Sequence, residues 1–221
     1  NGTTSATQSV FLGKTAGGYS TSVGNSNFFG ESAGAYTTNA GQSNFLGQGA
    51  GANTTDTYSS NFLGQGAGSL SSGAYESNFI GAGAGGEAGG AHDSNFIGQA
   101  AGLQAAGAHI SNFIGQSAGF LAVNSSQSNF IGYNAGQYAY NITDSNFIGT
   151  YAGDGSNIYV ISGISNSNFI GTNAGANALN ATSSTFIGGG AGLYAEGASQ
   201  AVFIGDNAGN NATTASYSTF I

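Results

Sequence analysis

The sequence predicts an all-β fold, a parallel β-solenoid (a β-roll or β-helix) of about 13 coils with 17 residues per coil. Three observations predict it. Phenylalanine recurs at a spacing of 17 residues, with one interval of 22. Glycine occupies 41 of the 221 positions and falls at fixed offsets within each repeat. Proline is absent, which excludes collagen and polyproline structures, and 15 Phe and 11 Tyr argue against a flexible glycine-rich linker.

The repeating unit reads S-N-F-I-G-x-x-A-G-x-x-[AST]-x-[GN]-A-x-x, and its serine is numbered position 1. Glycine at position 5, alanine at position 8 and glycine at position 9 are present in all twelve complete copies. The repeat covers essentially the whole chain. We therefore expect a single repeat domain, residues 1–221, that forms part of a longer fibre.

Each coil is expected to hold two strands. The S-N-F-I segment has high β-propensity and is followed by a glycine-rich turn, and a weaker strand fits unit positions 10 to 16. Helical repeats are longer, and glycines this frequent would cost about 1 kcal/mol each inside helices. The invariant glycines, and the choice of Gly, Asn or Asp at position 14, are typical of corners where the backbone takes positive φ.

Two apolar columns, each made of the residues at one unit position in successive coils, occupy positions 3 and 4. Neighbouring residues in a strand point to opposite faces, so Phe and Ile cannot both enter one narrow lumen. One column fills the interior and the other forms an outer apolar strip, which we expect to be buried against other chains. The pattern leaves open which column faces inward. Representative members are Phe79, Ile80, Phe113, Ile114, Phe147 and Ile148.

Asparagine precedes the phenylalanine in nine copies, from Asn27 to Asn168. Stacked asparagine amides can hydrogen-bond from one coil to the next. We predict a structural ladder at this position rather than a recognition site.

The segment N-F-I-G-x-x-A-G, repeated every 17 residues, resembles the glycine-punctuated repeats of trimeric autotransporter adhesin heads and of related phage tail-fibre shafts. The resemblance spans residues 9–221 and includes Ser111-Asn112-Phe113-Ile114-Gly115. Those heads carry a similar S-x-x-I-G core, usually with a shorter period. The resemblance implies a homotrimer of parallel β-coils, extracellular, on a cell surface or on a virion, that holds or forms a receptor-binding surface. It leaves adhesin and tail fibre as open alternatives.

An aromatic column at position 16 is the candidate surface contact. It comprises Tyr58, Tyr75, His92 and His109, which are expected to lie about 4.8 Å apart in successive coils. Glu76 and Asp93 follow two of these rings. Three interpretations stay open. We favour plain exposed side chains; the second interpretation is a surface that stacks on sugar rings of a cell-surface glycan or receptor, and the least favoured is part of a metal site.

The interval of 22 residues contains a five-residue insertion within residues 154–166. Insertions in solenoids are placed in loops, often on the binding face, and Tyr159 is therefore a further candidate surface contact. Ile158, Val160 and Ile164 instead favour a longer strand or an interchain clasp. Both interpretations stay open.

The composition restricts the function classes. One lysine against nine carboxylates gives a formal charge of −8, which disfavours nucleic acid and anionic lipid as partners, and no apolar run is long enough to insert in a membrane. No catalytic set, metal site or cofactor site is expected; the glycines of residues 81–86 fit a dinucleotide fingerprint only formally, since the repeat explains them.

The sequence therefore predicts a structural, non-catalytic shaft or head of an extracellular or virion fibre or adhesin, a rigid rod that attaches to a surface or receptor. The alternative is a self-assembling extracellular filament whose subunits stack end to end. Ice binding is a distant third, because a threonine array at Thr21, Thr38 and Thr55 is not continued in later coils.

Overall fold

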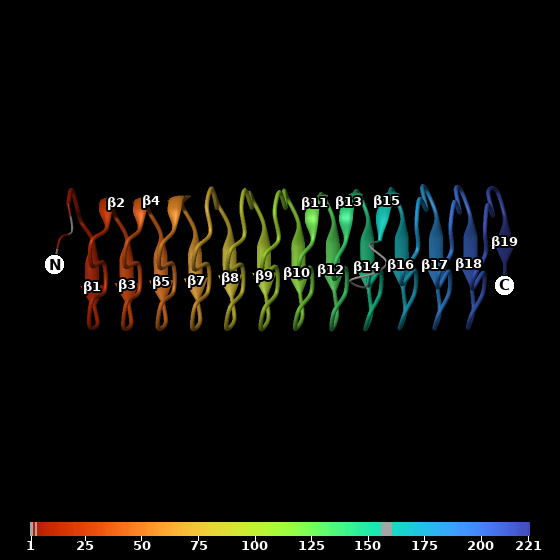
Figure 1. The fold of residues 1–221 in the computed structure, drawn as a ribbon, viewed down its shortest axis with the longest axis horizontal. Helices are drawn as coiled ribbons and strands as arrows, with labels where there is room; N and C mark the ends of the chain where they lie inside the picture. The colour runs from red at the N-terminus through yellow and green to blue at the C-terminus, as the bar shows by residue number, and fades with distance from the viewer. Residues whose placement is uncertain (1, 3, 156–160) are drawn as a thin grey trace. The chain divides into compact units, whose positions relative to one another are not determined.

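The computed structural model describes residues 2, 4–155 and 161–221. Its elements form an all-β parallel β-solenoid of about 12 turns, and the described residues contain no helix, which confirms the predicted fold class. The chain divides into two compact units, Asn1–His109 and Ile110–Ile221, which share the same repeat. Figure 1 shows that within each unit successive coils lie side by side in chain order.

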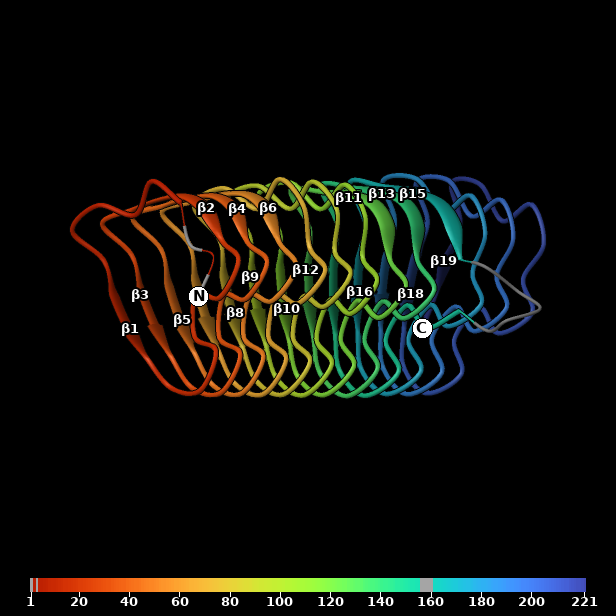
Figure 2. The ribbon, with the colours of Figure 1, turned by 60° about the vertical axis from the view of Figure 1, so that its left-hand side comes forward.

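The first unit contains two parallel sheets. The N-F-I segments, unit positions 2 to 4, pair in the order β1 (Val10–Leu12), β3 (Asn27–Phe29), β5 (Asn44–Leu46), β7 (Asn61–Leu63), β8 (Asn78–Ile80) and β9 (Asn95–Ile97). The second sheet contains β2 (Thr21–Gly24), β4 (Thr38–Gly41) and β6 (Thr55–Tyr58). The pairing register equals the repeat, so that Phe28 lies opposite Phe45. Figure 2 shows the two sheets on different sides of the same coils.

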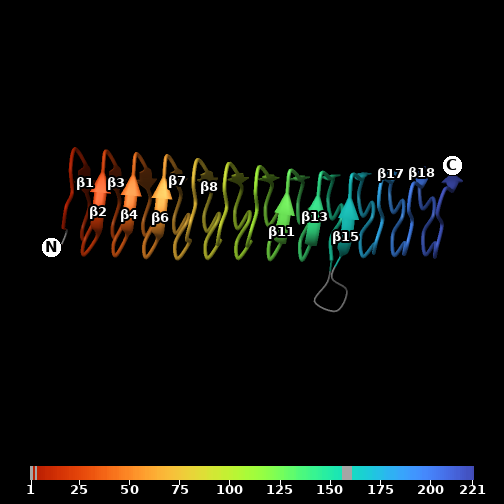
Figure 3. The same ribbon diagram turned by 90° about the horizontal axis from the view of Figure 1, so that it is seen from above.

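The second unit repeats this arrangement. Its N-F-I sheet contains β10 (Asn112–Ile114), β12 (Asn129–Ile131), β14 (Asn146–Ile148), β16 (Asn168–Ile170), β17 (Thr185–Ile187), β18 (Val202–Ile204) and β19 (Thr219–Phe220). The second sheet contains β11 (Val123–Ser126), β13 (Tyr140–Thr143) and β15 (Ser162–Ser165). Figure 3 shows each three-stranded sheet as a set of adjacent parallel arrows.

The second strand is shorter than the sequence predicts. It covers unit positions 13 to 16 rather than 10 to 16, and in several coils it is reduced to isolated bridges such as Ser72↔Gly89. Positions 10 to 12 form a turn, because the amide of position 12 bonds back to the carbonyl of position 9, as Ser71 does to Gly68 at 3.2 Å. The sequence pattern did not separate this turn from the strand that follows it.

The phenylalanine column fills the interior of the coils. From Phe28 to Phe96, and from Phe113 to Phe203, these side chains have no exposed surface. From Phe28 to Phe96 adjacent rings lie 4.6–4.8 Å apart between centroids and within 4° of parallel. Burying each ring contributes about 1.5–3 kcal/mol to folding. This settles the question left open by the sequence, since Phe faces inward and Ile faces outward.

Two hydrogen-bonded columns stabilise the stack, and the sequence predicted one of them. Asn61 Nδ2 donates to Asn78 Oδ1 at 2.8 Å, and the same bond recurs along both units at 2.7–2.9 Å, which confirms the asparagine ladder. The serines at position 1 form a buried column that we did not predict. Ser60 Oγ lies 2.9 Å from the carbonyl oxygens of Tyr58 and Ala74 and accepts from the amide of Ser77 at 3.2 Å. Buried hydroxyls of this kind therefore join neighbouring coils and have their own polar groups paired.

The corners confirm the predicted positive φ at the invariant glycines and at position 14. Gly64, at position 5, has φ of 136°, and a Cβ there would lie 2.5 Å from the carbonyl oxygen of Gly81 in the next coil. Asn39 and Asp56, at position 14, have φ of 56° and 52°. Positive φ also occurs at positions 7, 11 and 17, where residues such as Leu70 (φ 60°) gave no signal in the sequence.

Candidate surface-contact site

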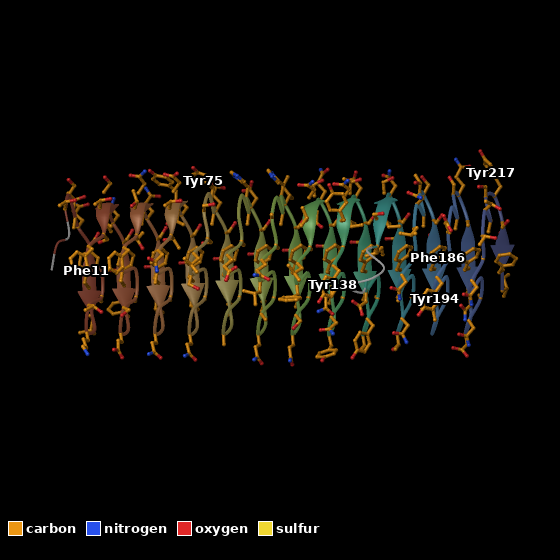
Figure 4. The ribbon with its side chains drawn as sticks, viewed as in Figure 1. Phe11, Tyr75, Tyr138, Phe186, Tyr194 and Tyr217 are labelled. Atoms are coloured by element: carbon orange, nitrogen blue, oxygen red, sulfur yellow. The ribbon has the colours of Figure 1, made fainter. Side chains whose placement is uncertain are left out.

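The aromatic column at position 16 forms as predicted. Tyr58 ends β6, and isolated parallel bridges align it with the three rings that follow in successive coils. The ring centroids of Tyr58 and Tyr75 lie 5.7 Å apart with planes 5° from parallel, and the next two separations are 4.9 Å and 5.0 Å. Position 15 points inward, so position 16 points outward and the rings lie on the surface of the first unit. In Figure 4 Tyr75 projects from the upper edge of its coil.

The column is polar and acidic along one side. Glu76 and Asp93 are exposed and have φ of 51° and 52°, which places them at the corner beyond the rings. Among the described residues no group of three or more His, Cys, Asp or Glu side chains comes together as a metal site. The arrangement offers flat ring faces and hydrogen-bonding groups rather than a coordination sphere.

An open depression lies at the amino-terminal end of the column. In the two coils that precede Tyr58, position 16 is glycine, at Gly24 and Gly41. Its lining residues are Ser5, Thr7, Ser22, Val23, Gly24, Asn25, Ala40, Gly41, Gln42 and Tyr58. The depression was not predicted from the sequence, although the two glycines of the column are visible there.

The isoleucine column lies on the outer face of the N-F-I sheet in both units. Ile80 is 38% exposed and Ile148 is 37% exposed in the isolated chain, whereas the phenylalanine that precedes each has no exposed surface. The column is therefore a continuous but half-covered apolar strip within each unit.

The insertion is bounded by ordinary coil positions. Gly155 occupies position 11, because its amide bonds to the carbonyl of Gln137 in the preceding coil, and Ile161 occupies position 12 and accepts from the amide of Tyr140. The five extra residues are thus 156–160. Tyr159, Ile158 and Val160 lie outside the described residues. Ile164 belongs to β15 and is fully buried.

Asp154 lies directly before this insertion and is half-buried. Its Oδ1 has no hydrogen-bond partner among the described residues, and burial raises the pKa of this carboxyl group from 3.8 to about 7. Asp154 gave no signal in the sequence, because its burial depends on the coil packed around it.

A second exposed aromatic pair occurs at position 11 of the first unit. The rings of Tyr19 and Tyr36 stack with centroids 5.1 Å apart and planes 12° from parallel, and the side chains are 59% and 57% exposed. The 17-residue spacing of these tyrosines was the signal that could have found the pair.

The fold defines a parallel β-solenoid repeat protein. Comparison with protein-family models and with curated proteins finds no match to this chain. The described residues include no helix of the length and apolarity needed to cross a membrane.

Proposed function

We propose that this protein is a structural, non-catalytic shaft or head of an extracellular or virion fibre or adhesin, and that three copies associate through their isoleucine columns. The observation that carries the proposal is the outward orientation of the isoleucine column beside a fully buried phenylalanine column. An apolar strip of this kind is typical of an interface between chains. The resemblance of the repeat to trimeric adhesin heads and tail-fibre shafts supports the number three.

The hydrogen bonding between stacked coils suits a rod that resists mechanical force. Backbone groups at the bends of each coil form hydrogen bonds to the coil before or after it. Examples are Gly64 N to Leu46 O and Gly68 N to Ala84 O, both 2.8 Å. Side-chain ladders of asparagine and serine add further bonds between the same coils. The position 16 aromatic column supplies an outward face for contact with a receptor or glycan.

The mass of the protein in solution tests the proposal. We expect light scattering at micromolar concentration to give three times the chain mass of 21.6 kDa. The double variant Ile114→Asn and Ile148→Asn should dissociate the trimer, because it places amides in the apolar interface. Ile110→Asn is the matched control, since Ile110 is 57% exposed and lies at position 17.

A monomer at micromolar concentration would refute the association through isoleucine. Long unbranched threads in negative-stain images would replace the shaft with the filament alternative. Trimers of the double variant as stable as those of the wild type would show that another face holds the chains together.

A further inference from the structure

The depression beside Tyr58 is suited to hold one flat ring. The Tyr58 side chain leans over Gly41, since a Cβ on Gly41 would lie 2.7 Å from Tyr58 Cδ1. Beyond it, a Cβ on Gly24 would meet only Thr7 Oγ1, at 3.4 Å. The aromatic column thus ends at Tyr58. The space beside its ring is left open because position 16 of the two preceding coils is glycine.

The walls of the depression supply neutral hydrogen-bonding groups. Hydroxyl groups come from Ser5, Ser22 and Thr7, and carboxamides come from Asn25 and Gln42, and none of the described lining residues is charged. The Gln42 amide is oriented by Ser59 Oγ, which donates to Gln42 Oε1 at 3.3 Å. These hydroxyl and carboxamide groups can both donate hydrogen bonds to, and accept them from, a ligand that lies next to the Tyr58 ring.

We propose that this depression binds the pyranose ring of a neutral saccharide, stacked on Tyr58. A pyranose has an apolar C–H face that packs on an aromatic ring and a rim of hydroxyl groups that pair with amides and hydroxyls. The neutral lining disfavours an anionic sugar, for which the described lining residues offer no cation. The many polar groups disfavour a purely apolar ring, whose binding would leave them without partners.

The stacked rings behind Tyr58 hold it in place. Tyr58 packs on Tyr75 at 5.7 Å, and Tyr75 on His92 at 4.9 Å, so the platform loses little side-chain freedom when a ligand stacks on it. Preorganisation of this kind raises the affinity of a small contact. Repetition of the protein in a fibre would add avidity without any new contact.

Saturation-transfer NMR and titration calorimetry on the full chain test the site. The probes are the methyl glycosides of glucose, galactose, mannose and N-acetylglucosamine, with sialyllactose as the anionic comparison and phenol as the apolar one. We expect at least one neutral glycoside to bind. Tyr58→Ala should weaken it about tenfold, and Tyr58→Phe should retain it.

Gly24→Tyr should abolish binding, because it fills the depression at a position where the added side chain has room. Tyr36→Ala is the matched control, since it removes another exposed, stacked tyrosine (57% exposed, against 43% for Tyr58) from a different column and should leave binding unchanged. Circular dichroism of each variant confirms that the coils remain folded.

Absence of binding by every neutral glycoside would overturn the proposal. So would binding that survives both Tyr58→Ala and Gly24→Tyr, or binding of phenol or sialyllactose alone. The inference rests on the proposed attachment function, but its failure is distinguishable: a trimer that binds no sugar refutes only the saccharide site, and a monomer that binds one refutes only the trimer.

Discussion

At the scale of single residues, the fold depends on backbone conformations that most side chains avoid. Left-handed φ is unfavourable for non-glycine residues by about 1 kcal/mol or more. Leu70 and Tyr36 nevertheless adopt φ near 60°, and the amide of each donates to a carbonyl of the preceding coil at 2.8–2.9 Å. Hydrogen bonds between coils therefore enforce a conformation that glycine, asparagine or aspartate would take more readily.

The invariant glycine at position 5 has a stricter requirement than the variable glycine at position 7. Gly64→Ala should destabilise the protein by several kcal/mol, because its Cβ would meet backbone of the next coil as well as an unfavourable φ. Gly83→Ala is the matched control, since Gly83 also has positive φ (67°) but no atom lies within 4 Å of its Cβ position. Its cost should be about 1 kcal/mol. Thermal or denaturant unfolding measures both, and equal costs would contradict the steric explanation.

At the scale of elements, each coil has one strand that is always present and a second that is a regular strand in only some coils. The N-F-I strand occurs in every coil because an inward aromatic and an outward β-branched or aliphatic residue suit a sheet with one covered face. The second strand is regular in β2, β4, β6, β11, β13 and β15, and in other coils it is reduced to an isolated bridge, as at Gly89 and Leu179. The residue type at position 13 does not decide between the two, since Ser162 begins β15 whereas Thr213 forms only a bridge.

The five-residue insertion is predicted to be dispensable for the fold. Gly155 and Ile161 occupy the positions that are joined by one peptide bond in other coils. Deletion of residues 156–160 should restore the 17-residue spacing, with the circular dichroism spectrum unchanged and the unfolding midpoint retained or raised, because a longer loop has a larger closure entropy. Loss of folding would show that the inserted residues are required for the coil.

At the scale of the whole molecule, charge is the property most unlike that of ordinary domains. The chain has nine carboxylates and one lysine, so acidification removes repulsion between carboxylates throughout the chain. Asp154 adds a specific effect, since burial raises its pKa to about 7. A carboxyl group whose pKa is higher in the folded state binds a proton more tightly there. Its contribution to stability is therefore fully present below about pH 4 and is lost as the pH rises through about 7.

Asp154→Asn should remove this dependence. Between about pH 4 and 7 the unfolding midpoint of the wild type should fall relative to that of the variant, and the difference should become constant at higher pH. Asp144→Asn, which removes one exposed carboxylate, is the control for net charge. Parallel profiles of the wild type and the Asp154 variant would refute the effect.

Much of the fold was predictable because one pattern is repeated. The N-F-I strands, the asparagine ladder, the corner glycines and the position 16 column all follow from spacing. Alternation in a strand separates Phe from Ile but does not say which faces inward. That choice depends on the room left beside the glycine at position 9, against which each buried ring packs. The depression also escaped prediction, because it depends on how Tyr58 leans over Gly41.

The ladders that link equivalent residues have a consequence for the gene. Asn61, Asn78 and Asn95 are linked by the same bond from coil to coil, so a coil that carries this asparagine can take the place of another without changing the ladder. Slippage during replication that duplicates or deletes one complete repeat leaves every bonding pattern intact. Selection can thus adjust the number of coils in whole steps, whereas a gain or loss of a few codons must be accommodated in a loop.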